Sequence, residues 1–216
     1  MRKQTQTEYA YSYIRNKILD GSFKPAQKLN ESQLSETIGV SRNTIKKAFL
    51  MLEKENLIQI EKNKGATIKS YTLQEILNYM EIRMVLEGIV IKSAVKNITQ
   101  QQLNQLEKVF HTMGECIKWN KLEDYSKYNK YFHNIIYSAS TNEQAIQIIN
   151  IIKTQLNRFQ FKTILVPGRN LQSYKEHENI LLALSSRNED EAVSAIQSHI
   201  VNISNVIKEN YKLLVL

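Results

Sequence analysis

The sequence predicts a mainly α-helical protein, in which an N-terminal winged helix-turn-helix precedes a C-terminal all-α bundle of about six helices. Three observations support this fold class. Two short helical patterns meet at a glycine, two short alternating segments follow across a turn, and helical periodicity then continues to the C-terminus. We therefore expect one domain over residues 1–70 and a second over residues 71–216.

The first helix is expected over residues 7–19, because Tyr11, Ile14 and Ile18 share one helical face. An Asp-Gly pair directly after these residues ends the helix. Arg15 lies off the apolar face. It is therefore either a contact to a DNA phosphate or simply a solvated side chain.

A short helix is expected over residues 31–38, because Leu34 and Ile38 lie four residues apart on one face. Asn30 is a candidate N-cap. Gly39 ends this helix, since glycine enters the left-handed conformation without a clash of a Cβ atom. The chain then turns tightly into the next helix.

The next helix, residues 42–54, begins after Ser41, a favourable N-cap residue. Its apolar stripe consists of Ile45, Ala48, Phe49 and Leu52. Its opposite face carries Arg42, Asn43, Lys46 and Lys47. Two helices joined by a tight glycine-containing turn, the second with a basic outer face, indicate a helix-turn-helix. In this motif the second helix enters the major groove, where Asn reads adenine and Arg or Lys reads guanine.

Two short segments, residues 57–60 and 66–69, then alternate as strands do. The basic turn between them contains Lys64 and Gly65, which we predict to be a hairpin tip. Such a hairpin after a recognition helix is typical of a wing that reaches phosphates or the minor groove. The alternative is a small helical domain with an unrelated hairpin.

Positive charge is concentrated near the N-terminus. The total net charge is +8. Residues 1–70 carry 13 Lys and Arg against 7 Asp and Glu, a net charge of +6. Residues 71–216 carry 16 Lys and Arg against 14 Asp and Glu, a net charge of +2. This division is typical of a nucleic-acid-binding head on a nearly neutral body. We do not expect a membrane partner, because no amphipathic helix has a Trp- or Phe-rich apolar face.

The composition indicates a soluble cytoplasmic protein. Cys116 is the single cysteine, which excludes an internal disulfide and suits a reducing compartment. We expect it to be an inert buried thiol. The N-terminus lacks the apolar core of a signal peptide, and no run of about 18 apolar residues occurs.

From residue 72 onward the pattern is helical throughout. Thr72 and Glu75 form a capping box at the start of this region. We predict helices over residues 72–96, 99–118, 121–139, 142–162, 170–186 and 189–212. No linker rich in Pro, Gly or Ser separates this region from the basic head, so the junction is expected to be short.

The N-terminal part of the chain resembles a known family. The block KLNESQLSETIGVSRNTIKKAFLMLEKENLIQIEKNKGATI is similar to the winged-helix head of GntR-type bacterial regulators, most specifically in its GVSR and KGATI segments. The resemblance implies DNA contacts by Arg42, Asn43, Thr44 and Lys46, with Gly65 as the wing-tip glycine. It also implies that the helical bundle is an effector domain of the FadR C-terminal (FCD) type.

The recognition helix departs from the pattern of many relatives. Thr44 stands where they have Pro, and Lys46-Lys47 stands where they have Arg-Glu. Lysine lacks the bidentate fork of arginine, so base reading at this position is expected to differ.

His177 and His199 lie on consecutive helices whose turn is centred near Asn188, and each is 11 residues from that turn. In an antiparallel helical hairpin, equal distance from the turn places two side chains at the same level. On the helix 121–139, Asn129 and His133 share the inner face, four residues apart. The three imidazoles therefore form either a transition-metal site or a set of ordinary core histidines.

The resemblance favours the metal. Metal-binding members of the FCD class carry Asp-x-x-x-His followed by two later histidines, and Asn129, His133, His177 and His199 occupy these positions. Zinc is the expected ion, with nickel as the alternative. Asn129 replaces the usual Asp, and a neutral amide oxygen is a weaker ligand than a carboxylate. His111 lies outside the pattern and is expected at the surface.

Arg83 has two interpretations. It forms either an i,i+4 ion pair with Glu87 at the end of the bundle or a bidentate clamp for the carboxylate of an effector. The resemblance favours an arginine near the effector pocket.

These observations predict a ligand-controlled transcription regulator, most simply a repressor, that binds a palindromic double-stranded operator as a homodimer. The alternative is a three-histidine hydrolase with an incidental basic head. Glu176 and Glu178 neighbour His177 but are expected to point to other helix faces, so we assign no catalytic residue. A nucleoid-type DNA binder conflicts with the large neutral helical domain.

Overall fold

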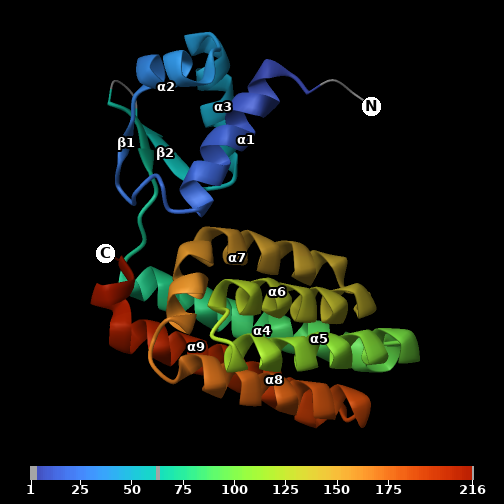
Figure 1. The fold of residues 1–216 in the computed structure, drawn as a ribbon. Helices are drawn as coiled ribbons and strands as arrows, with labels where there is room; N and C mark the ends of the chain where they lie inside the picture. The colour runs from blue at the N-terminus through green and yellow to red at the C-terminus, as the bar shows by residue number, and fades with distance from the viewer. Residues whose placement is uncertain (1–3, 62–63, 216) are drawn as a thin grey trace. The chain divides into compact units, whose positions relative to one another are not determined.

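A computed structural model describes residues 4–61 and 64–215 of the chain. The chain divides into two compact units, residues 1–72 and 73–216, which we describe separately. Figure 1 shows a small mixed unit and an all-helical unit, so the predicted fold class is confirmed.

The first unit combines short helices with a small antiparallel sheet (Figure 1). Its elements are α1 (Gln6–Leu19), β1 (Lys28–Leu29), α2 (Glu31–Ile38), α3 (Arg42–Lys54), β2 (Ile58–Glu61) and β3 (Gly65–Ile68). The strand order is β1-β3-β2, and Ile58 lies opposite Ile68 in the β2–β3 pair. This pair is the hairpin expected after the second helix of the helix-turn-helix. The extended connection before α2 contributes β1 as a third strand.

The predicted caps set the turn between α2 and α3. The Asn30 side chain accepts a hydrogen bond from the backbone N–H of Gln33, which caps α2. Gly39 ends α2 with φ of 75°, in the left-handed region that disfavours a Cβ atom. Ser41 then caps α3 by accepting from the N–H of Thr44 at 3.1 Å. Because Ile45, Ala48, Phe49 and Leu52 are buried, the opposite face of α3 points outward.

The second unit is a bundle of long helices that pack side by side (Figure 1). They are α4 (Leu73–Asn97), α5 (Gln100–Lys118), α6 (Leu122–Ala139), α7 (Glu143–Ile164), α8 (Arg169–Ser185) and α9 (Glu189–Val215). These bounds agree with the predicted ones to within three residues at every end. Leu106, Phe132, Ile180 and Ile196 are among the buried residues of its core.

The α8–α9 hairpin is fixed to the rest of the bundle at its turn. The Arg187 guanidinium donates to the carbonyls of Val95 and Ile98, at 2.9 and 2.6 Å. These bonds satisfy one carbonyl in the last turn of α4 and one directly after it, where the helix itself supplies no donor. No helix in the described part of the chain is both long and apolar enough to cross a membrane.

Candidate metal centre and ligand cavity

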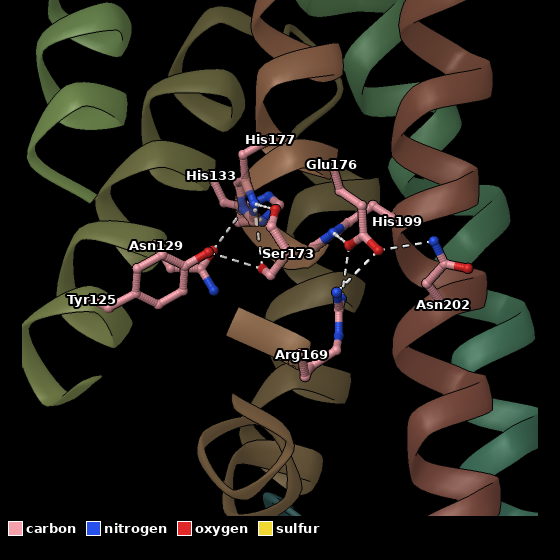
Figure 2. A network of polar contacts seen from close by, with 9 residues as sticks. All are labelled: Tyr125, Asn129, His133, Arg169, Ser173, Glu176, His177, His199 and Asn202. Carbon is pink, nitrogen blue, oxygen red and sulfur yellow. Dashed lines mark hydrogen bonds and ion pairs between the residues drawn. The ribbon is translucent and has the colours of Figure 1, made fainter. Parts of the chain in front are cut away.

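Three buried imidazoles converge inside the helical unit, one from each of α6, α8 and α9 (Figure 2). His133, His177 and His199 each offer a ring nitrogen, and these nitrogens all lie within 4.8 Å of one another. His177 and His199 meet across the α8–α9 hairpin with ring centroids 4.7 Å apart. Their equal distance from the turn therefore does bring them to one level.

Hydrogen bonds fix the orientation of His177. Its Nδ1–H donates to the backbone carbonyl of Ser173, 2.6 Å away on the preceding turn of α8. With the proton on Nδ1, the lone pair of Nε2 faces the centre. There it lies 3.3 Å from Nε2 of His133 and 2.9 Å from Oδ1 of Asn129. Both predicted α6 residues therefore reach the same point as His177.

A buried carboxylate orients His199 in a similar way. Nδ1 of His199 donates to Oε2 of Glu176 at 2.7 Å. Glu176 also accepts two bonds from the Arg169 guanidinium, at 3.0 and 2.7 Å, and one from the amide of Asn202, at 2.8 Å (Figure 2). Burial alone opposes ionisation of Glu176, but the bonds from His199 and Arg169 lower the pKa of this carboxyl group below its usual value.

The expectation that Glu176 points away from the centre is wrong. It lies one residue before His177, about 100° around the helix, a difference set by 3.6 residues per turn. The inner side of α8 faces both α6 and α9. His177 reaches toward His133 of α6, whereas Glu176 reaches toward His199 of α9. Glu178 is exposed, as expected.

Sequence reasoning also missed Arg169, Ser173 and Asn202. Arg169 is the first residue of α8, one position before the predicted start of that helix. It is buried and pairs with Glu176 seven residues away, a spacing that no local helical rule singles out. Asn202 lies three residues after His199 on the same face of α9. This i,i+3 spacing is the sequence feature that could have placed Asn202 near the site.

The electrostatics of the centre favour neutral imidazoles. Burial is the main cause that lowers the pKa of all three histidines, and it lowers that of His177 to about 3. Neutral imidazole is the form that coordinates a metal ion. Nδ1 of His133 is buried and has no hydrogen-bond partner among the described residues.

The donor set fits a transition-metal ion. Zinc and related ions take imidazole nitrogens, and metal-bound histidines usually donate their other ring N–H to a carbonyl or carboxylate. His177 and His199 have such acceptors in the Ser173 carbonyl and Glu176. The residues present can therefore hold an ion through His133, His177 and His199, with Asn129 beside them.

A cavity opens beside the histidines and is lined by basic side chains. Arg83 belongs to this lining and is 2 % exposed. Its Nε donates to Oε1 of the equally buried Glu87 at 3.0 Å, while its Nη1 has no hydrogen-bond partner among the described residues. The ion pair with Glu87 therefore exists, but it lies inside the bundle and leaves one donor nitrogen of Arg83 unused.

The predicted DNA-contacting residues of α3 lie on its outer face. Arg42, Asn43, Lys46 and Lys47 are exposed, and Thr44 is half-buried. Arg42 and Lys46 lie 3.7 and 3.8 Å from a carboxylate oxygen of Glu31, which are loose contacts at the surface. Both side chains are more than 60 % exposed, so they remain free to reach a ligand.

The remaining predicted contacts differ in their surroundings. Lys64 is exposed and pairs with Glu61, and Gly65 begins β3 with φ of 89°. Arg15 is only partly exposed, and its Nε pairs with Glu55 at 2.9 Å. This carboxylate partner makes Arg15 a weaker candidate for a phosphate contact than the cations of α3. His111 lies at the surface, as expected.

Comparison with known proteins matches both units to described families. The family model "Bacterial regulatory proteins, gntR family" matches residues 6–68, and the FCD domain model matches residues 78–202. The Escherichia coli (strain K12) transcriptional repressor RspR is 25% identical over 206 residues, covering 95% of this chain and 90% of that protein. The Bacillus subtilis (strain 168) regulator YdhC is 25% identical over 191 residues, covering 88% and 85%.

Solved structures share the fold. E. coli McbR/YncC has a TM-score of 0.76 at 18% identity and covers 96% of this chain and 99% of its own. The similar proteins are transcriptional regulators and not enzymes, which argues against the hydrolase alternative.

Proposed function

Because the chain belongs to the GntR family of bacterial regulatory proteins and carries an FCD effector domain, we propose that it is a metal-containing repressor released from its operator by an organic acid. The observation that carries this proposal is the meeting of three buried imidazoles beside a cavity lined by basic residues. The first group of residues suits a metal ion, and the second suits the acid.

The α3 face supports operator binding. It presents three exposed cations, Arg42, Lys46 and Lys47, together with Asn43, on a head whose net charge is strongly positive. Arginine and lysine read guanine in the major groove, and asparagine reads adenine. One such helix reads only a few base pairs, so a palindromic operator bound by two heads supplies the remaining specificity.

An apolar face of the helical unit supports a homodimer. Ile82, Val85 and Ile89 follow one another along one side of α4 and are 44 to 53% exposed. Ile148 and Ile151 of α7, which packs against α4, are also exposed. A second copy of the same chain is the occupant that two-fold operator symmetry requires, and an isologous contact would bury this face on both subunits.

Three histidines with a neutral amide as the fourth group suit zinc, with nickel as the alternative. We infer that His133, His177 and His199 hold the ion and that Asn129 is a weak additional ligand. A bound ion would supply a Lewis-acidic point for the oxygens of the effector. Glu176 and Ser173 orient His199 and His177, and Arg169 holds Glu176 in place.

Arg83 is the residue that we assign to the effector's carboxylate. Its Nη1 is a buried donor that no described residue pairs with, and an unpaired buried donor costs about 1–3 kcal/mol. A carboxylate in the cavity would remove that cost. The effector releases DNA if it binds the released form of the protein more tightly than the operator-bound form. A difference of about 1–3 kcal/mol in its binding free energy is sufficient.

The test uses the purified full chain and DNA from upstream of its own gene. We expect a retarded complex at low ionic strength that survives competition by random DNA, together with a transition metal found by elemental analysis. Absence of any DNA complex at low salt would overturn the operator assignment. Absence of metal after growth with zinc and nickel would overturn the metal assignment independently of it.

A further inference from the structure

The described side chains around the cavity carry more positive charges than the carboxylates that pair with them. Among the residues that the structure describes, the cationic side chains that line it are Arg83, Lys130, Lys153 and Arg169. The two arginines each have a carboxylate partner, Glu87 and Glu176. Neither lysine has an ion-pair partner in the part of the chain that the structure describes. Lys130 is exposed, but Lys153 is partly buried, so solvent screens the charge of Lys153 less.

The contacts of Lys153 do not neutralise it. Its Nζ lies 3.3 Å from Oη of Tyr137 and 4.9 Å from the centroid of that ring. The hydroxyl of Tyr137 donates its own proton to Oε1 of Glu87 at 2.7 Å, so it is a neutral phenol. Lys153 interacts with a neutral oxygen and an aromatic face, neither of which carries a compensating charge.

The charge of Glu87 acts on both Arg83 and Lys153. Glu87 accepts from Nε of Arg83 and from Tyr137, while Nη1 of Arg83 is buried without a partner in the described residues. Burial and then the charge of Arg83 lower the pKa of Lys153 to about 8, so this amine is still mostly protonated at neutral pH. Two cations thus face the cavity against one carboxylate, which is an arrangement that an anionic ligand stabilises.

We propose that the histidine centre holds one acidic group of the effector and that Lys153 joins Nη1 of Arg83, the carboxylate position of the proposed function, in a second acid-binding subsite, so that the effector is a diacid. The inference rests on the proposed function, since it assumes that the cavity takes an acid at all. A monoacid placed at the histidines would leave the excess charge of Lys153 unbalanced.

The test compares two acids that differ by one carboxylate group. L-Lactate and L-malate share a 2-hydroxy acid group, and malate adds one carboxylate. Binding of each to the full-length, zinc-loaded protein is measured by isothermal titration calorimetry. We expect malate to bind at least tenfold more tightly than lactate. We expect Lys153→Met to remove this difference while leaving the affinity for lactate unchanged. Lys175→Met, which removes an exposed lysine outside the cavity lining, is the matched control.

The outcomes separate this inference from the function on which it rests. If lactate binds and malate binds no more tightly, the second subsite does not exist, although the acid-binding cavity does. If neither acid binds, the carboxylate effector is itself wrong, and the inference fails with it. If Lys153→Met lowers the affinity for both acids equally, Lys153 contributes only to the electrostatic potential of the cavity. The second subsite is then refuted. Lys153→Gln serves in its place if the Met variant does not retain its metal and its melting temperature.

Discussion

Oε2 of Glu176 lies 2.7 Å from Nδ1 of His199, which makes this carboxylate the hydrogen-bond acceptor that orients a predicted metal ligand from the neighbouring helix. Glu176 is itself held by Arg169 and Asn202, so its position is fixed on three sides. The centre thus includes partners behind its ligands. Such partners set the ring orientation and the tautomer of a metal-bound histidine.

Glu176→Gln is expected to weaken metal binding by about 10–100-fold, the usual cost of losing such a partner. Glutamine keeps the size of the side chain but removes the charge that stabilises the Nδ1–H tautomer of His199. The affinity is measured by competition with a zinc-chelating dye. Glu178→Gln, which changes an exposed acid on the same helix, is the control and is expected to leave affinity unchanged. Equal affinities in the two variants would contradict the assigned role of Glu176.

The meeting of the histidines could be predicted because it depends on simple helical geometry. His177 and His199 are equally far from one turn, and His133 lies on the apolar stripe of its helix. The surrounding polar network depends instead on how α8 is rotated between α6 and α9, which local periodicity does not define. Glu176 was therefore assigned to the wrong face.

Contacts between distant parts of the chain explain why the sequence did not indicate the other polar residues of the site. The bounds of the helices followed from caps and breaks in the sequence, such as Asn30 and Gly39 in the head. Lys153 reaches the Arg83 cavity only because α7 packs against α4. Nothing within the α7 sequence distinguishes Lys153 from a solvated lysine.

The double variant His177→Ala with His199→Ala is expected to lose its bound metal, because one imidazole and one amide cannot replace three imidazoles. Elemental analysis of the purified protein measures the loss. His111→Ala, at an exposed position on α5, should retain the metal. Zinc should also raise the unfolding free energy of the wild-type chain, by about 2.7 kcal/mol at 100 times Kd, and not that of the double variant. An unchanged metal content in the double variant would remove the site.

Asn129→Asp is expected to tighten metal binding, since it places a charged carboxylate oxygen where a neutral amide oxygen now lies 2.9 Å from Nε2 of His177. A carboxylate is the stronger ligand for a divalent cation. The rate at which a chelator removes zinc measures the effect and should fall. Asn134→Asp, an exposed position on the same helix, controls for the added charge. A rate equal to that of Asn134→Asp would mean that this position lies outside the coordination sphere.

Arg42→Ala is expected to reduce discrimination between operator and random DNA by about 1–3 kcal/mol for each half-site, the range for a lost base contact. Fluorescence anisotropy with both DNAs at one salt concentration measures this ratio. Lys54→Ala, at the exposed C-terminal end of α3, removes the same charge away from the reading end of the helix. If the ratio for Arg42→Ala equals that of the control, Arg42 contacts only phosphates.

Val85→Glu is expected to convert the proposed dimer into monomers. It places a charge at the centre of the exposed apolar face of α4, where two symmetry-related copies of residue 85 would approach each other. Val85 is 53% exposed in the single chain, so the substitution costs little within one subunit. Sedimentation equilibrium measures the mass. Leu182→Glu is the control, since Leu182 is 62% exposed on α8, outside this face. The monomer should retain its metal and its affinity for a half-site but lose the added affinity for the full palindrome. A Val85→Glu chain that stays dimeric would place the subunit contact elsewhere.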